Sequence, residues 1–220
     1  MHKKCLPKEG WMVLKSLESF ANHNGAILAG GTALALQIGH RISYDLDFFT
    51  PKHFKTEDIL KFIKKTGFRF QILSESTDTF IAEINGVKFS VFTYEYPFIE
   101  KTFKTGEIQL ANILDIAAMK LIAVAQRGAR RDFVDLFFIL QEIPFHKIVN
   151  VTLQKFGHER INPLHIGKAL VYFNDADSDP EPRYIKDKEV HWVIIKKYFS
   201  SHIKQLVYDL SATRPAGSLD

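Results

Sequence analysis

The chain has 220 residues, of which 46% are hydrophobic and 25% charged, as is usual for a protein with a packed core and unlike a disordered chain. Its formal net charge of +4 is compatible with a nucleic-acid partner but does not require one. No segment approaches the run of about 18 apolar residues that a membrane span needs, and the first residues lack the apolar core of a secretion signal. With a single cysteine, Cys5, these features predict a cytoplasmic protein without membrane association.

The first half of the chain alternates strand-like and helical segments. The apolar run 26–29 ends at Gly30-Gly31, which predicts a buried strand, a tight turn and then a helix capped by Thr32. Asn85-Gly86 is a strong hairpin signal between two strand-like runs. The further segments expected here are strands at 42–49, 68–73, 79–84 and 87–94 and a helix at 56–65.

From Leu110 onward the apolar residues recur every three or four positions, as in amphipathic helices. Helices are expected near 113–124, 133–140, 145–156, 163–174 and 189–209. The acidic segment 175–182 has the spacing of a calcium loop without its central Gly and closing Glu, so no metal site is expected there. The predicted fold is α+β, with a mixed sheet and flanking helices in residues 1–105 and a helical bundle in residues 106–220.

Residues 41–49 alternate strictly between polar and apolar positions, as in a strand with one buried face. The polar face would carry Arg41, Ser43, Asp45 and Asp47, and the buried face Ile42, Tyr44, Leu46 and Phe48. Carboxylates two positions apart on a strand lie within about 7 Å of each other and repel unless a divalent cation such as Mg²⁺ lies between them. The alternative is an exposed strand face on which Arg41 neutralises one acid.

The turn upstream of these acids strengthens the first interpretation. Gly30-Gly31-Thr32 stands between a strand and a helix, where exposed backbone N–H groups can bind phosphate. A phosphate-binding turn close to metal-binding acids is what metal-dependent phosphoryl transfer requires.

The segment from Gly30 to Phe49 resembles the nucleotidyltransferase signature of the AbiEii/AbiGii toxin family, which belongs to the DNA polymerase β-like superfamily. Asp115–Leu121 and Arg127–Leu136 resemble a second block of that family, and the resemblance covers about residues 10–145. It implies a nucleotidyltransferase-type sheet and Mg²⁺-dependent transfer of a nucleotide from an NTP, onto tRNA in members studied as toxins. It also implies a cognate antitoxin in a phage-defence (abortive infection) module.

The resemblance also implies roles for individual residues. Asp45 and Asp47 would bind Mg²⁺ and act in catalysis together with Lys120 and Asp132. The residues that would bind the NTP are Gly30, Gly31, Thr32, Arg41, Ser43 and Lys120.

The residue pattern itself leaves alternatives for several of these positions. Lys120 can instead extend along an apolar helix face to water, and Asp132 can complement the helix dipole or pair with a neighbouring cation. Structural or orienting roles are expected for Asp115 and Asp135. The lysines of the last predicted helix offer either a track for an RNA backbone or a solvated face.

One position departs from the family pattern. Polymerase β-like enzymes carry a third acid on a later strand, and Ser90 stands at that place here, with Glu83 on the neighbouring strand as a candidate substitute. A single Mg²⁺ held by Asp45, Asp47 and the triphosphate is therefore expected. Two other functions stay open: a kinase-like phosphotransferase that acts on a protein, and a degenerate member that binds RNA or a partner without catalysis.

Overall fold

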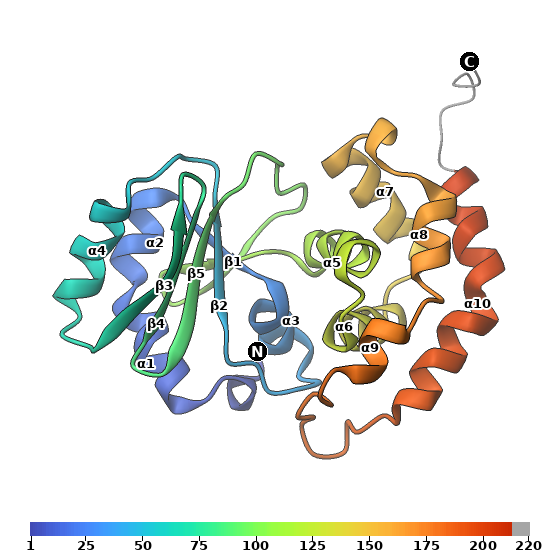
Figure 1. Cartoon of the computed structure of the whole chain (residues 1–220), viewed down its shortest axis with the longest axis horizontal. Helices are drawn as coiled ribbons and strands as arrows, with labels where there is room; N and C mark the ends of the chain where they lie inside the picture. Colours follow the sequence, from blue (N-terminus) through green and yellow to red (C-terminus); the bar gives the residue numbers. More distant parts are fainter. Residues whose placement is uncertain (213–220) are drawn as a thin grey trace. The chain divides into compact units, whose positions relative to one another are not determined.

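The computed structural model describes residues 1–212 and divides into two compact units, Met1–Asn112 and a second that begins at Ile113 (Figure 1). The first unit combines a sheet with helices and the second is helical, which confirms the α+β fold class. The division follows Asn112 rather than residue 105, because strands β6 (Phe103–Thr105) and β7 (Ile108–Leu110) join the sheet of the first unit. Within the described residues, no helix is both long enough and apolar enough to span a bilayer.

The first unit, all of which is described, is built on a seven-stranded mixed sheet in the order β3-β4-β5-β2-β1-β7-β6. Strand β2 is central, antiparallel to β1 and parallel to β5. The other strands are β1 (Ile27–Ala29), β2 (Leu46–Thr50), β3 (Phe70–Ser76), β4 (Thr79–Ile84) and β5 (Val87–Thr93). The helices are α1 (Lys8–Ser16), α2 (Glu18–Asn24), α3 (Gly30–Ile38) and α4 (Thr56–Lys65), preceded by a 3₁₀ turn at Lys3–Cys5.

The two faces of this sheet differ in chemistry. On one face, Phe20 of α2 packs edge-on against Phe48 of β2 and Phe89 of β5, with ring centroids 6.1 and 5.6 Å apart. Because side chains alternate along a strand, Asp47 lies on the opposite face. On that face the ring centroids of Phe49 and Phe92 are 5.2 Å apart. The core face therefore fixes the register that places Asp47 on the polar face.

Segments with strong local signals follow the prediction closely. Helix α4 and strand β4 have the predicted bounds, 56–65 and 79–84. In the hairpin between β4 and β5, Asn85 and Gly86 have φ angles of 50° and 77°, the two positive values of a type I′ turn.

The second unit consists, in its described part, of helices joined by turns and loops. These are α5 (Ile113–Arg127), α6 (Arg130–Leu140), α7 (Phe145–Phe156), α8 (Pro163–Ala169), α9 (Asn174–Ser178) and α10 (Trp192–Ala212), with a 3₁₀ turn at His158–Arg160. The single helix predicted at 163–174 is wrong, since α8 ends at Ala169 and α9 begins at Asn174. The Asn162 side chain caps α8 by accepting hydrogen bonds from the backbone N–H groups of Leu164 and His165.

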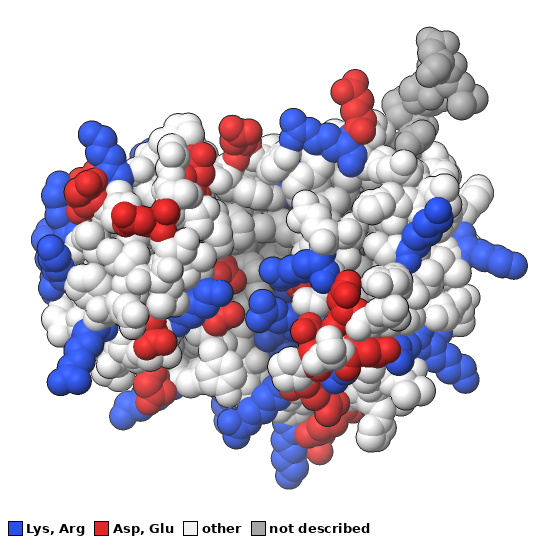
Figure 2. Space-filling model, in the orientation of Figure 1, with Lys and Arg blue, Asp and Glu red and all other residues white. Residues whose placement is uncertain are grey.

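The acidic segment after α8 is held by contacts within the second unit. The Asp177 carboxylate accepts hydrogen bonds from Trp192 Nε1 (2.6 Å) and Lys196 Nζ (2.9 Å) of α10, and Asp179 accepts one from the Arg130 backbone N–H (2.9 Å). On the face that Figure 2 shows, acidic and basic side chains are interspersed over both units rather than separated. The net charge of +4 is therefore not gathered in one basic patch on that face.

A buried ion pair joins α5 to α7. Lys155 Nζ lies 3.0 Å from Asp115 Oδ1, and both side chains are fully buried. Burial lowers the pKa of Lys155, and the Asp115 carboxylate opposes that shift. Asp115 thus has a packing partner on α7, which fits the orienting role expected for it.

We expect Lys155→Met to lower the free energy of unfolding by about 3 kcal/mol, because it leaves the Asp115 carboxylate buried without its lysine. The double variant Asp115→Leu/Lys155→Met should recover most of this loss, since two apolar side chains replace the pair. Urea denaturation measures both. Lys61→Met, which removes an exposed pair with Asp58, is the control and should leave stability unchanged. Equal losses in Lys155→Met and the control would contradict the prediction.

Candidate active site

The turn at Gly30-Gly31 packs directly against the carboxylate of Asp47. Ala29, the last residue of β1, pairs with Asp47 of β2, so the chain turns away beside that side chain. Gly30 has φ +66°, and a Cβ at this position would lie 3.1 Å from Asp47 Oδ2. A larger residue would meet both backbone strain and a crowded carboxylate, so this position requires glycine.

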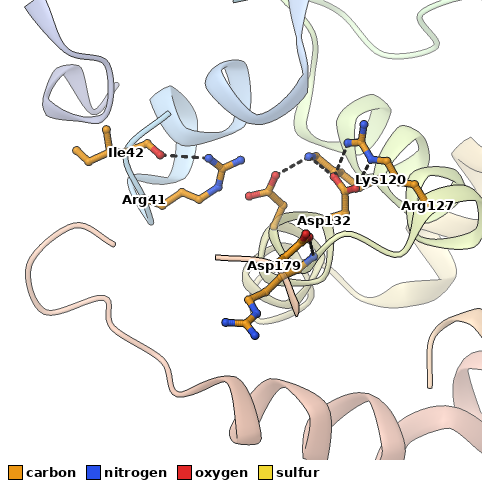
Figure 3. Close-up of polar contacts among 8 residues, drawn as sticks. Arg41, Ile42, Lys120, Arg127, Asp132 and Asp179 are labelled. Atoms are coloured by element: carbon orange, nitrogen blue, oxygen red, sulfur yellow. Dashed lines mark hydrogen bonds and ion pairs between the residues drawn. The ribbon is translucent and has the colours of Figure 1, made fainter. Parts of the chain in front are cut away.

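Strand β2 begins later than the alternating pattern predicts. It starts at Leu46 rather than at residue 42, and Tyr44, predicted on the buried face, is 51% exposed. Ser43 donates its backbone N–H to the Cys5 carbonyl (2.8 Å), so this segment packs against the N-terminal turn instead of extending the strand. Arg41 is buried, and its Nη1 donates to the Ile42 carbonyl at 3.1 Å (Figure 3).

Thr32 does not cap helix α3, which corrects the sequence-based prediction. Its Oγ1 lies 2.8 Å from Ser43 Oγ and donates to the main-chain carbonyl of Asp45. The N-terminus of α3 has no side-chain cap. Thr32 thus ties the helix to the segment that carries the first aspartate, and the first N–H groups of α3 keep their capacity to bind an anion.

Ser90 occupies the position beside Asp47 on the polar face. The two residues pair in the parallel register of β2 and β5, and Ser90 Oγ is buried without a hydrogen-bond partner in the described part of the chain. Glu83 lies on the same face but pairs with Lys88, one strand further out and two positions along. By sheet spacings its Cα is about 12 Å from that of Asp47, too far for both carboxylates to share one cation.

Asp47 is the carboxylate that β2 places on this face, and Asp45 lies one residue before the strand, with its main-chain carbonyl held by Thr32. Residues 1–212 contain no group of three or more His, Cys, Asp or Glu side chains that could hold a metal ion. Mg²⁺ is commonly bound by one or two carboxylates together with substrate phosphates and water. The two aspartates, with the uncapped N-terminus of α3 beside them, fit that mode of binding.

A second polar cluster lies inside the second unit, between α5 and α6. Lys120 Nζ is 2.7 Å from Asp132 Oδ1 and 2.6 Å from Asp135 Oδ2, and both carboxylates are fully buried (Figure 3). Arg127 binds Asp132 through Nε at 2.7 Å and Nη2 at 3.0 Å. The Lys120 side chain is only 8% exposed, so it binds the two acids rather than extending to water.

These cations determine the ionisation of Asp132. Burial raises the pKa of its carboxyl group, but the charges and hydrogen bonds of Lys120 and Arg127 outweigh that effect and bring the pKa below its usual value of 3.8. Asp132 is therefore ionised near neutral pH and is a weak base.

The sequence leaves Lys120, Arg130 and Arg131 as possible partners for the two acids, of which the structure confirms Lys120, and it assigns no such role to Arg127. The available signal was its spacing of seven residues from Lys120, which places both cations on one face of α5. Arg130 instead donates through Nε to the Ala176 carbonyl at 2.9 Å and fixes α9.

We expect the effect of Lys120→Met on stability to depend on pH. At pH 7 the variant should lose about 3 kcal/mol, because two buried carboxylates lose their shared cation. In the wild type, the stabilisation from Asp132 is present above pH 3.8 and is lost as the pH falls through the lower folded-state pKa. Without Lys120 the pKa of Asp132 rises, so its buried carboxylate takes up a proton at a higher pH than in the wild type. The stability deficit of the variant should therefore become smaller as the pH falls from 7 towards 4. Urea unfolding between pH 7 and pH 4 tests this, and a deficit independent of pH would contradict it.

The family model described as nucleotidyl transferase AbiEii toxin, type IV toxin–antitoxin system, matches residues 13–98 and 55–213. An uncharacterised protein of Aquifex aeolicus (strain VF5) is 37% identical over 204 residues, which cover 91% of this chain and 97% of that protein.

Solved structures of low sequence identity share the fold of this chain. MenT4, a nucleotidyltransferase toxin from Mycobacterium tuberculosis, superposes with a TM-score of 0.58 at 16% identity, covering 94% of this chain and 93% of its own. JHP933 from Helicobacter pylori gives a TM-score of 0.57 at 17% identity, and the superposition covers 96% of this chain and 92% of JHP933. The family resemblance inferred from the sequence is thus confirmed, and the chain belongs to the AbiEii nucleotidyltransferase toxin family of type IV toxin–antitoxin systems.

Proposed function

We propose that this toxin transfers a nucleoside monophosphate from an NTP to an RNA acceptor, tRNA first among the candidates, in a reaction that needs Mg²⁺. The observation that carries the proposal is the close packing of the Gly30 turn against Asp47. It sets a phosphate-binding backbone beside a carboxylate that can hold the cation of a metal–nucleotide complex.

The triphosphate would bind at the N-terminus of α3. The backbone N–H groups of Gly31 and Thr32 lie in the first turn of this helix, which has no side-chain cap and carries the positive end of the helix dipole. Mg²⁺ held by Asp45 and Asp47 would neutralise phosphate charge and polarise the phosphorus that is attacked.

Arg41 supplies fixed positive charge next to this turn. A Cβ on Gly31 would collide with the Arg41 guanidinium, so the glycine allows the arginine to lie against the backbone. A buried guanidinium held in this way can stabilise the charge that develops on the leaving pyrophosphate without reorganising.

The chemical step is a single displacement at the α-phosphorus. The acceptor hydroxyl oxygen forms a bond to that phosphorus, the bond to the β-phosphate oxygen breaks, and pyrophosphate leaves. The hydroxyl proton would pass to Asp45 or Asp47, since Lys120 and Arg127 keep the pKa of Asp132 below its usual value and so make Asp132 a weak base. A direct role of Lys120 at the triphosphate stays a prediction, and its contacts with Asp132 and Asp135 support a positioning role.

Family membership supports two further parts of the proposal. A toxin of a type IV system has a cognate antitoxin, and we propose an antitoxin protein of the same system as the partner. We place both in the cytoplasm, where NTP and tRNA are present.

One observation favours a second candidate, a degenerate member that binds RNA or a partner without catalysis. Ser90 stands beside Asp47 where polymerase β-like enzymes carry their third acid. Such a protein would show no Mg²⁺-dependent binding of NTP by calorimetry, whereas the proposed enzyme would bind NTP only with Mg²⁺.

We expect Asp45→Asn and Asp47→Asn each to reduce transfer of label from α-labelled NTP to total tRNA by at least about 100-fold, with an unchanged thermal midpoint. Each NTP is incubated with Mg²⁺ and tRNA and the products are separated on a gel. Glu83→Gln, which removes a carboxylate of the same sheet face at a distance from Asp47, should retain activity.

The position of the label distinguishes the reaction classes. Retention of α-label on tRNA means nucleotidyl transfer, whereas retention of γ-label on a protein would mean a kinase and would overturn the proposal. Full activity in either aspartate variant would also overturn it.

A further inference from the structure

A pocket in the second unit has no role in the proposed chemistry. It lies between the C-terminal end of α5 and helix α8 and has a volume of about 320 Å³. Its polar and aromatic lining includes Arg127, His165, Lys168, Tyr172 and Asp175. This volume is at the lower end of the range of small-molecule sites and is suited to a single nucleotide unit.

Helix α8 and the segment after it both contribute side chains to this pocket. His165 and Lys168, three residues apart on α8, share one face of the helix, and Tyr172 lines the same pocket from the segment that follows it. All three side chains are exposed, and the Tyr172 ring is 52% accessible. A cation beside an accessible aromatic ring is the usual combination for binding single-stranded nucleic acid without sequence preference.

Arg127 adds a cation of fixed orientation on the α5 side. Its two hydrogen bonds to Asp132 hold the guanidinium in place, although its side chain is 53% exposed. A planar guanidinium that is already oriented binds a phosphate group with less loss of entropy than a mobile one.

Acceptor groups gather at the end of the pocket next to Gly128. Asp175 Oδ2 lies 3.7 Å, and the Val124 carbonyl 3.9 Å, from the position of a Gly128 Cβ. Cations for a phosphate and acceptors for the amino groups of a base match a nucleotide better than an inorganic anion.

We propose that this pocket binds one nucleotide of the acceptor RNA, with its phosphate on Arg127 and Lys168 and its base against Tyr172. The inference rests on the proposed function in one respect, that the acceptor is RNA. Arg127 shares Asp132 with Lys120, so the pocket adjoins the buried cluster of the second unit. Lys196 of α10 fits this role less well, since it is bound to Asp177 and lies 5.9 Å from the Trp192 ring centroid.

The test measures RNA binding without turnover. Fluorescence anisotropy with a labelled single-stranded oligoribonucleotide that ends in a 3′-hydroxyl is recorded without NTP at several salt concentrations, with total tRNA as competitor. Lys168→Gln should weaken binding about tenfold and reduce the salt dependence by about one phosphate contact. Tyr172→Ala should weaken it about tenfold without changing the salt dependence, and Tyr172→Phe should retain binding.

Lys147→Gln is the matched control, because it removes the same charge from an exposed position on α7 outside the pocket lining. It should bind RNA like the wild type. Calorimetry of ATP with Mg²⁺ forms a second arm, in which Lys168→Gln and Tyr172→Ala should both behave as wild type. Loss of ATP binding with intact RNA binding would assign the pocket to the NTP and overturn the inference, as would equal effects in Lys147→Gln.

The outcomes separate this inference from the proposed function. A wild-type protein that binds RNA through Lys168 and Tyr172 but transfers no label would contradict the proposed function alone. An active enzyme whose pocket variants bind RNA like the wild type would overturn this inference alone. A wild-type protein that does not bind RNA at all would also overturn the inference that this pocket binds a nucleotide of the acceptor RNA.

Discussion

The contact between Gly30 and Asp47 is the constraint on which the first unit depends. The antiparallel register of β1 and β2 places Ala29 opposite Asp47, and the chain can turn into α3 at that point only because Gly30 has no Cβ. Thr32 adds a second tie through the Asp45 carbonyl. The Gly30-Gly31 turn, the Asp47 carboxylate and the main chain of Asp45 are thus one local structure. Its register is secured by the aromatic core on the other sheet face, since a slip of one residue would turn Asp47 into that core.

The second unit uses buried charge to set the register of its helices. Helix α5 contributes a buried lysine to α6, through Lys120, and a buried aspartate to α7, through Asp115. Helix α5 presents a cation to α6 and an anion to α7. If α6 and α7 exchanged places, like charges would therefore be buried together. Buried ion pairs add little net stability compared with apolar residues of the same size. Their effect here is to define which helix faces which, and to hold Arg127 in a fixed orientation beside the α8 pocket.

The sequence predicted best those elements whose signal is local. Helix α4 and the turn of the Asn85-Gly86 hairpin depend on periodicity and turn chemistry, and both lie where the sequence predicts them. The alternation at 41–45 looked like strand, but the Ser43 N–H is taken by the Cys5 carbonyl, a contact that no local pattern reveals. Spacing along one helix likewise shows which residues share a face and not what that face meets. For that reason the partner of Lys120 stayed open and Arg127 had no predicted role.

The residue that the sheet places beside Asp47 is the neutral Ser90, and this limits the negative charge of the candidate site. A third carboxylate beside Asp47 would add like charge to a face that already carries two, and a second cation would be needed to offset the repulsion. With a neutral hydroxyl at this position and Glu83 too distant to replace it, one divalent cation balances the two aspartates. In the proposed mechanism, the remaining charge of a bound triphosphate would be balanced by Arg41 and the N-terminus of α3, both of which lie at the Gly30-Gly31 turn. This charge balance supports the single-cation form of the proposed mechanism.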